Sequence, residues 1–476
     1  MKCLPAHQRC AAVLIIGAGL LGIMACQRQE TAAHMPPTAT LPAPLPTARP
    51  TTPPFLELPS YAYEALPYLL SQTGAFTDTA TLTPTPSMLP YAVNSPLWTD
   101  GALKKRWIVV PHLPDLKAED RPAISFTPTG EWYFPSGTVL VKQFDLATDE
   151  RDPTKVRRLE TRFIVRSNDG QVYGATYRWR DDQTDAELLY DGRDDDITIT
   201  KHDGSTHVQR WHYPSRTECL SCHNRIAGGV LGVSTRQINA DVIDMHGKRV
   251  NQLQRWNELG LFQPPIRAEE FAQLPRLVNP NDPHADLTDR VRSYLDSNCS
   301  HCHRPGAMAF VSYDARFETP IERQNMLYAR PINDYGIDRV RYIKPNDPWR
   351  SMVLVRLERG DTMKMPPLGR NVLDHQAIDL LREWITSMDA PPALPPPKIT
   401  VDGNRVTGPI TVSATHSDPQ AILYYTLDGS LPDDESPVYQ QPLTVSAPAR
   451  VRIKAIRNGY ASSIALLTEL YAPQKL

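Results

Sequence analysis

Apolar and polar residues alternate along several stretches of the first half of the chain, which is the pattern of strands with one buried face. Two of these stretches flank the turn sequence Asn168-Asp169-Gly170, and two others flank His202-Asp203-Gly204, so each pair predicts a β-hairpin. The predicted strands cover residues 106–110, 137–144, 156–166, 171–180, 197–200 and 207–211. We therefore predict an antiparallel sandwich or barrel-like β domain over residues 56–214.

Helical spacing of apolar residues replaces this alternation further along the chain. The apolar residues of 287–295 and of 377–388 each fall on one stripe. They follow Asp286 and Asp374, and aspartate is a favoured residue at a helix N-cap. A shorter helix is predicted near residues 248–259.

The last part of the chain returns to the alternating pattern. Residues 421–427 and 450–456 read as strands, and Asp428-Gly429 reads as a turn after the first of them. A stiff proline-rich linker over residues 390–398 precedes this part. We predict a separate small β domain over residues 399–476.

The beginning of the chain has the features of an export signal. Residues 1–25 contain two basic residues, an apolar run and no acidic residue, which predicts a secretory leader. The leader ends in a sequence that resembles a lipobox, and by that resemblance Cys26 is acylated and becomes the first residue of the mature chain. An ordinary signal peptide cut at a small residue is the alternative. Residues 26–55 follow as a proline- and threonine-rich tether.

Composition and charge narrow the class of protein. The chain has 476 residues with 46 prolines, a length that predicts two to four domains and a composition that predicts linkers and loop-rich β structure. The formal net charge of −2 gives no reason to expect nucleic acid or an anionic membrane surface as partner.

Four of the seven cysteines belong to two Cys-X-X-Cys-His motifs. The motifs consist of Cys219, Cys222 and His223 and of Cys299, Cys302 and His303. Two cysteines at this spacing can form thioethers with the two vinyl groups of a haem, and the next histidine then becomes the proximal ligand of the iron. The other three cysteines lie in the leader or end it, so none is left for a disulfide. We predict two covalently attached c-type haems; a zinc site of four cysteines is the alternative, but it does not explain the two histidines.

The sixth ligand of the iron at His223 is not marked by a motif. The candidates are Met245, His246, His202, His207 and His212. Each of them is also compatible with an ordinary surface or core role.

The second motif has clearer surroundings. A helix leads into Cys299, a loop with Met365-Pro366-Pro367 follows, and another helix closes the segment. Proline excludes helix from the loop and keeps it extended, so the loop can present a thioether to iron. This arrangement resembles the cytochrome c fold, and by that resemblance His303 and Met365 are the axial ligands, with Met363 as the alternative to Met365.

The middle of the chain also resembles a family of exported dihaem c-type cytochromes. The stretches that carry this resemblance are residues 70–76, 91–101, 132–142, 218–232, 299–306, 314–325 and 365–369. Residues 425–432, 436–439 and 451–455 resemble the immunoglobulin-like domain at the C-terminus of chitobiase and related hexosaminidases. That resemblance implies an accessory β-sandwich without catalytic residues.

These observations predict a multidomain chain with an N-terminal all-β domain, α-helical cytochrome c-like haem domains and a C-terminal immunoglobulin-like β-sandwich. The predicted parts are a lipoprotein signal peptide (1–25), a linker (26–55), a β-rich domain (56–214), a first c-haem segment (215–275), a cytochrome c-like domain (276–389), a proline-rich linker (390–398) and the chitobiase-like sandwich (399–476).

The predicted function is electron transfer by a dihaem protein that a lipid anchor holds in the bacterial envelope, facing the periplasm or on the outer membrane. The expected partner is a redox protein or a quinone-linked donor, and no catalytic residue is assigned. One alternative is a dihaem oxidoreductase or peroxidase with an open haem at His223. Another is a surface redox protein that binds a polysaccharide.

Overall fold

The computed structural model describes residues 39–41, 43, 45–243, 248–307, 313–403 and 409–470. Residues 37–476 belong to one compact unit. The predicted leader and Cys26 lie outside the described residues, and so do Met245 and His246. None of the described helices is long and apolar enough to cross a membrane.

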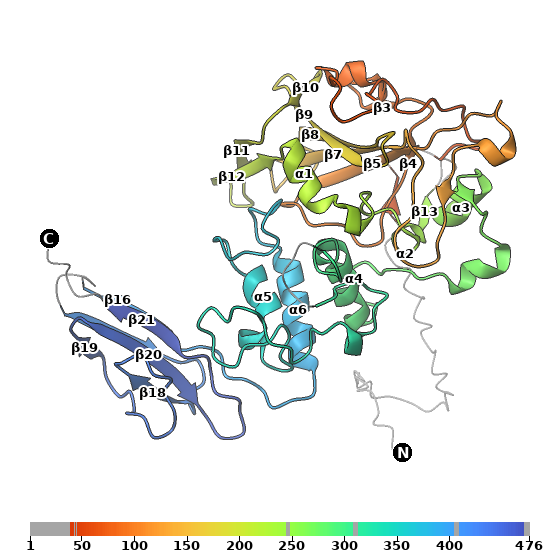
Figure 1. Cartoon of the computed structure of the whole chain (residues 1–476). Helices are drawn as coiled ribbons and strands as arrows, with labels where there is room; N and C mark the ends of the chain where they lie inside the picture. Colours follow the sequence, from red (N-terminus) through yellow and green to blue (C-terminus); the bar gives the residue numbers. More distant parts are fainter. Residues whose placement is uncertain are drawn as a thin grey trace, which may run out of the picture. The chain divides into compact units, whose positions relative to one another are not determined.

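A six-stranded antiparallel sheet organises the first half of the chain (Figure 1). In sheet order its strands are β10 (Ala186–Leu189), β9 (Val172–Trp179), β8 (Val156–Arg166), β7 (Val139–Ala147), β5 (Leu103–Val109) and β4 (Leu89–Pro90). The sheet is open, with β10 and β4 at its edges, so it does not close into a barrel. Both predicted hairpins are confirmed, as β8–β9 and as a separate pair of β11 (Arg193–Thr200) and β12 (Thr206–Tyr213).

The sheet is buried on both faces, which explains why the alternation along its strands is only partial. One face packs Trp107, Val141 and Phe163 against the segment that contains Leu58 and Leu70. The other face packs a second core, in which Ile108, Leu140 and Ile164 meet Cys219, Val230 and Trp256 from further along the chain. Polar residues at the same strand positions therefore face an interior and not solvent.

Short elements complete this part of the chain. They are β1 (Ala39–Thr40), η1 (Leu70–Thr73), β2 (Phe76–Asp78), β3 (Thr83–Pro84), η2 (Ala118–Asp120), β6 (Ile124–Ser125), α1 (Arg216–Cys222), η3 (Arg225–Ala227), α2 (Thr235–Ile238), β13 (Asp241–Ile243), β14 (Arg249–Asn251), α3 (Gln252–Glu258), β15 (Phe262–Gln263) and η4 (Ala268–Gln273).

The segment from 276 to 389 contains α4 (Leu287–Cys299), η5 (Ile321–Arg323), η6 (Pro348–Arg350), α5 (Met352–Leu357) and α6 (His375–Ser387). Asp286 caps α4 by accepting hydrogen bonds from the backbone N–H groups of Thr288 and Asp289, at 2.8 and 3.1 Å. Asp374 caps α6 in the same way. The two long helices were predicted at these positions, and their apolar stripes pack on each other.

The prediction of α-helical cytochrome c-like haem domains is nevertheless wrong. The described structure consists mostly of strands and loops, with few helices. Residues 215–275 form short helices interleaved with strands. Long loops separate α4, α5 and α6, and they are held by arginines that donate to backbone carbonyls, such as Arg370 to Leu357 and Arg359. These bonds satisfy the loop backbone without a helical ladder.

Six strands form a C-terminal β domain with two three-stranded sheets. The first sheet contains β16 (Lys398–Asp402), β17 (Ile410–Thr415) and β19 (Leu443–Val445), and the second contains β18 (Ile422–Thr426), β20 (Ala449–Ile456) and β21 (Leu466–Leu470). Val412 of the first sheet and Val451 and Ile453 of the second share one buried core. The predicted C-terminal β-sandwich is confirmed.

Candidate functional site

One cavity of about 680 Å³ contains both Cys-X-X-Cys-His motifs on its wall. Its volume lies within the range of roughly 300–1,000 Å³ that is usual for small-molecule and cofactor sites. The motifs are separated by some eighty positions in the sequence, and the strands β5, β7 and β8 supply a further side of the same cavity. Tertiary structure thus joins two motifs that the sequence analysis placed in separate domains.

Helix α1 holds the first motif against the sheet. Ser215 and Glu218 form a reciprocal capping box at its N-terminus, in which each side chain accepts a hydrogen bond from the other residue's backbone N–H. The helix packs on β9 at Gly174, so that Cys219 is buried against the sheet while Cys222 is half-buried. The absence of a side chain at Gly174 is what allows this close approach.

His223 is oriented by its own loop. Its backbone N–H donates to the carbonyl oxygen of Cys219 at 2.9 Å, which continues the helical turn. Its Nδ1 lies 2.8 Å from the carbonyl oxygen of Gly229, and because a carbonyl can only accept, Nδ1 carries the proton. Nε2 then has a free lone pair, the form in which an imidazole binds iron. Burial is the main cause that lowers the pKa of His223 to about 4.

Helix α4 delivers the second motif. Cys299 is its last residue, and the backbone N–H of His303 donates to the carbonyl oxygen of Cys299 at 2.8 Å. The imidazole of His303 stacks on the ring of Tyr313, with the ring centroids 4.3 Å apart and the planes 9° from parallel. Its Nδ1 is buried without a hydrogen-bond partner among the described residues, and burial lowers the pKa of His303 to about 4. An orphaned buried nitrogen of this kind costs free energy unless something binds the ring.

The two motifs touch each other. The Nδ2 atom of Asn224, directly after the first motif, donates to the carbonyl oxygen of His301 in the second motif at 3.3 Å. The thiols of Cys222 and Cys302 interact, and their hydrogen bond is the main cause that lowers the pKa of Cys302 and raises the pKa of Cys222. One cysteine of each motif therefore lies beside one cysteine of the other motif.

The methionine loop reaches the same cavity. Met365 lines it, and the backbone N–H of Met365 donates to the carbonyl oxygen of Arg356 at 3.0 Å. Met363, the alternative ligand, is absent from the described lining residues, whereas its carbonyl oxygen accepts a hydrogen bond from Arg356 Nε at 2.8 Å. Met352, a buried residue of α5, also lines the cavity, but no sequence signal marks it, because a methionine in a helix looks like ordinary packing.

The histidines proposed as sixth ligand of the first iron have different positions. His212 lines the cavity, but Asp194 lies 2.6 Å from its Nδ1 and Glu218 lies 3.1 Å from its Nε2, so both nitrogens are engaged. His202 is 79% exposed beside Glu150, and neither His202 nor His207 belongs to the described lining of the cavity. His301, which the sequence analysis did not consider, is buried and lines the cavity.

Three basic residues on the sheet were also missed. Arg106 of β5, Lys142 of β7 and Arg162 of β8 line the cavity and lie directly opposite one another on neighbouring strands. The sequence alone shows only that each of the three residues falls within a predicted strand. The register of the strands, which the sequence does not reveal, places them in one row.

The acidic residues of the cavity wall are already paired. Glu131 binds Arg236 and Arg304 at 3.1 and 3.0 Å, and Asp296 binds Arg236 at 3.0 Å. Arg236 comes from α2 and Asp296 from α4, so this buried network fastens the two motif-bearing segments to each other. The carboxylates of this network are therefore already bound in structural ion pairs.

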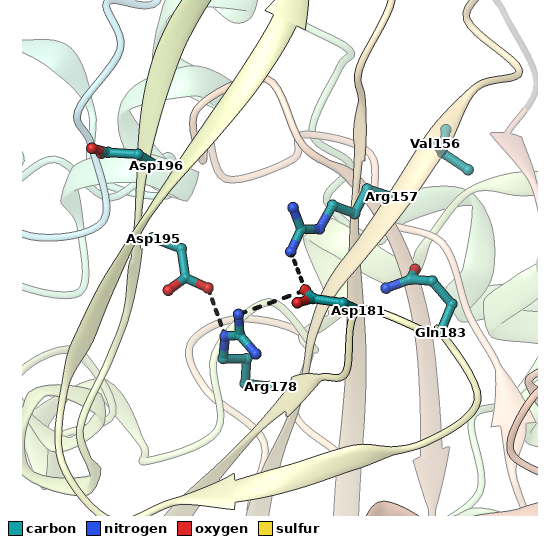
Figure 2. A pocket seen from close by; sticks show the side chains of 7 residues that line it. All are labelled: Val156, Arg157, Arg178, Asp181, Gln183, Asp195 and Asp196. Carbon is teal, nitrogen blue, oxygen red and sulfur yellow. Dashed lines mark hydrogen bonds and ion pairs between the residues drawn. The ribbon is translucent and has the colours of Figure 1, made fainter.

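A second, smaller pocket lies on the β domain and is polar throughout except for Val156. Figure 2 shows Arg178 between Asp195 and Asp181, with Arg157 on the other side of Asp181. The arginine–aspartate contacts are 2.6 Å to Asp195 and 2.8 Å from Arg157 to Asp181. These charges neutralise one another, and the pocket offers no chemistry of its own.

Among the residues that the structure describes, no group of three or more His, Cys, Asp or Glu side chains is arranged to hold a metal ion. The four-cysteine zinc site therefore finds no support. The classification of the chain as a metal-binding cytochrome c is wrong on these findings, since the fold is mostly β and no cytochrome family model matches. The chemistry of the two motifs has to be judged from the cavity itself.

Comparison with known proteins identifies one part of the chain. Residues 401–468 match the family model of the chitobiase/beta-hexosaminidase C-terminal domain. This agrees with the two-sheet structure of that part. A search of curated proteins finds no match.

Proposed function

We propose that the chain carries two haems, attached through Cys219 and Cys222 and through Cys299 and Cys302, and that it transfers electrons in the bacterial envelope. The observation that carries the proposal is the shared cavity, on whose wall both motifs stand with Cys222 beside Cys302. Thioether formation needs two cysteines three positions apart on the wall of a cavity. Both motifs meet this requirement.

Three further residues fit such a group. His223 presents an unprotonated Nε2 because Nδ1 is fixed by Gly229, and His303 has a buried ring nitrogen that lacks a partner in the described part of the chain. Met365 lines the cavity, and its thioether is a soft ligand of a kind that haem iron accepts. When bound, the haems would supply one-electron redox chemistry.

The chain's own residues define what this chemistry can be. The network around Arg236 holds the two motif segments in a fixed relation, which suits rapid exchange of electrons between adjacent groups. The His212 imidazole is tied to Asp194 and Glu218 and is not free to act as an acid or base at the cavity. Electron transfer needs no such residue, and for this reason it is the preferred function.

The remaining parts of the proposal concern location and partners. The leader and Cys26 predict export and a lipid anchor, with the protein facing the periplasm or on the outer membrane. The redox partner is a protein or a quinone-linked donor. A polysaccharide partner for the C-terminal domain stays a prediction that retention on chitin would test.

The test is covalent haem content after export in a bacterium that attaches c-type haem. Mass spectrometry of the intact chain and the haemochrome spectrum in pyridine should show two haems per chain. Replacing Cys219 and Cys222 together by alanine should leave one haem, and so should the matching pair in the second motif. Leu220→Ala is the matched control, because Leu220 is an exposed residue between the first two cysteines and should leave both haems in place. An exported wild-type chain without covalent haem would refute the proposal.

A second candidate function is an oxidoreductase with an open coordination position at His223. It is favoured by the pairing of His212 with two carboxylates, because His212 is the one described candidate for the sixth ligand that lines the cavity. Electron paramagnetic resonance would decide, since it reports the axial ligands of both irons. A high-spin signal and rapid cyanide binding would support the oxidoreductase, and two low-spin signals would support electron transfer.

A further inference from the structure

We propose that Arg106, Lys142 and Arg162 form a carboxylate-binding row and that the row takes the propionates of the haem attached at the first motif. This inference rests on the proposed function and goes beyond it by assigning residues of the β domain to the cofactor. Its basis is the arrangement of charge on one face of the sheet.

The row is created by strand register. Arg106 pairs with Lys142 across β5 and β7, and Lys142 pairs with Arg162 across β7 and β8. Residues directly opposite on antiparallel strands have Cα atoms about 4.5–5.5 Å apart and point to the same face. Like charges in such positions repel one another, so a row of three cations destabilises the sheet unless an anion lies beside it.

Of the three charges of the row, the described residues neutralise only that of Arg162. Glu160 binds Arg162 through both oxygens, at 2.5 and 2.9 Å, and accepts a further hydrogen bond from Trp211 Nε1 at 3.1 Å. Within the described residues, neither Arg106 nor Lys142 has an ion pair with a carboxylate. Glu131, Asp296 and Glu218, which also line the cavity, are held by Arg236, Arg304 and His212.

The environment of these two cations is unfavourable in the absence of an anion. Burial, followed by the repulsion of Arg106, lowers the pKa of Lys142 well below its usual value. Burial likewise lowers the pKa of Arg106. Both residues line the cavity and not the outer surface. An anion that offsets the free-energy cost of burying their charges therefore has to bind inside the cavity.

The row also lies in the right place relative to the first motif. Arg162 pairs with Thr176 on β9, two residues from Gly174, which contacts Cys219. From there the row leads across β8, β7 and β5, away from the cysteines. A haem carries its vinyl groups and its propionates on different edges of the ring, so a haem attached at Cys219 and Cys222 can direct two carboxylates toward two unpaired cations.

A carboxylate could also come from a small free ligand, such as a dicarboxylate. The experiment therefore uses two probes. The first is the exported holoprotein labelled with ¹³C in the haem propionate carboxyls, which allows infrared spectroscopy to follow their ionisation. The second is succinate, added to the exported protein and followed by calorimetry.

With the first probe we expect the propionates of one haem to ionise at lower pH than those of the other. Lys142→Met and Arg106→Met should each raise the proton affinity of that pair at least tenfold and should lower the reduction potential of the same haem, because a positive charge beside it is lost. Lys142→Arg keeps the charge and should retain the wild-type behaviour. Lys105→Met is the matched control, because Lys105 is half-exposed and pairs with Asp145.

The outcomes separate this inference from the proposed function. If two haems are attached but neither variant changes the ionisation of the propionates or the reduction potential, the assignment of the row to haem propionates is overturned, while the proposed function stands. If succinate binds with an affinity that depends on Lys142 and Arg106, the assignment to haem propionates is overturned in favour of a free ligand. If no haem is attached and succinate does not bind, both proposals fail.

Discussion

Gly174 of β9 and Cys219 of α1 lie in direct contact, and a Cβ atom placed on Gly174 would be 2.9 Å from the Cβ and 3.0 Å from the Sγ of Cys219. Helix α1 can therefore approach the sheet only where the strand has no side chain. This contact determines the distance between the first Cys-X-X-Cys-His motif and the sheet, and it thereby determines the position of one wall of the cavity.

Gly174→Ala should lower the free energy of unfolding by about 2 kcal/mol, in the range of overpacked cores, and reduce haem attachment at the first motif. Chemical denaturation and mass spectrometry of the exported chain would measure the two effects. Gly360→Ala is the control, because nothing lies within 4 Å of a Cβ at that position. Equal stability of the two variants would show that α1 can move away from β9 at little cost.

Met365→Leu should lower the reduction potential of one haem, by a part of the roughly 0.8 V range that axial ligands span. A leucine keeps the volume but removes the sulfur ligand, which favours the reduced iron. Potentiometric titration would measure the change. Met363→Leu should have little effect, since Met363 is outside the described lining of the cavity. A drop in potential with Met352→Leu instead would transfer the ligand role to α5.

Arg236→Met should destabilise the protein by about 3–5 kcal/mol, because it leaves Asp296 buried without its partner. Asp296→Asn in the same chain should restore a large part of this loss, since the uncompensated charge is then removed. Denaturation of the two single variants and the double variant would give the coupling energy. Arg267→Met, which breaks an exposed pair with Glu270, should cost less than about 1 kcal/mol. If the changes in the free energy of unfolding caused by Arg236→Met and Asp296→Asn simply add in the double variant, the buried interaction between the two residues is contradicted.

Lys104 should make stability depend on pH in the alkaline range. Burial, followed by repulsion from Arg106, lowers the pKa of Lys104 to about 7 from 10.5. Between these values the unfolded chain binds more protons than the folded chain, so the free energy of unfolding should rise with pH from 7 to 10.5. Below pH 7 Lys104 is protonated in both states, and the full free-energy cost of burying its charge is present.

Lys104→Met should remove this slope and raise stability at pH 7 by up to about 2 kcal/mol, a value reduced for the partial exposure of the side chain. Denaturant titrations at pH 7, 8.5 and 10 would show the difference between the two proteins. Lys105→Met, a change at the neighbouring half-exposed position, should leave the slope intact. A wild-type protein whose stability does not change across this range would rule out a buried ammonium at position 104.

The local elements and the motifs could be predicted from the sequence alone. Residues 156–166 form a strand with the predicted bounds, Asp286 and Asp374 cap the two long helices, and the C-terminal β domain appears where the alternating pattern returns. These features depend on residues close together in the chain, for which periodicity and capping chemistry are sufficient.

The way in which these parts combine depends on contacts between residues that are distant in the sequence. The α-helical haem domains were predicted from two helices, but loops held by arginine side chains occupy most of the space between them, and such bonds leave no periodic signal. The row of Arg106, Lys142 and Arg162 depends on strand register, and the contact of Cys222 with Cys302 depends on packing between segments about eighty residues apart. Residues distant in sequence are brought together by the burial of both faces of one sheet, and a linear pattern of apolar residues does not specify which partner covers each face.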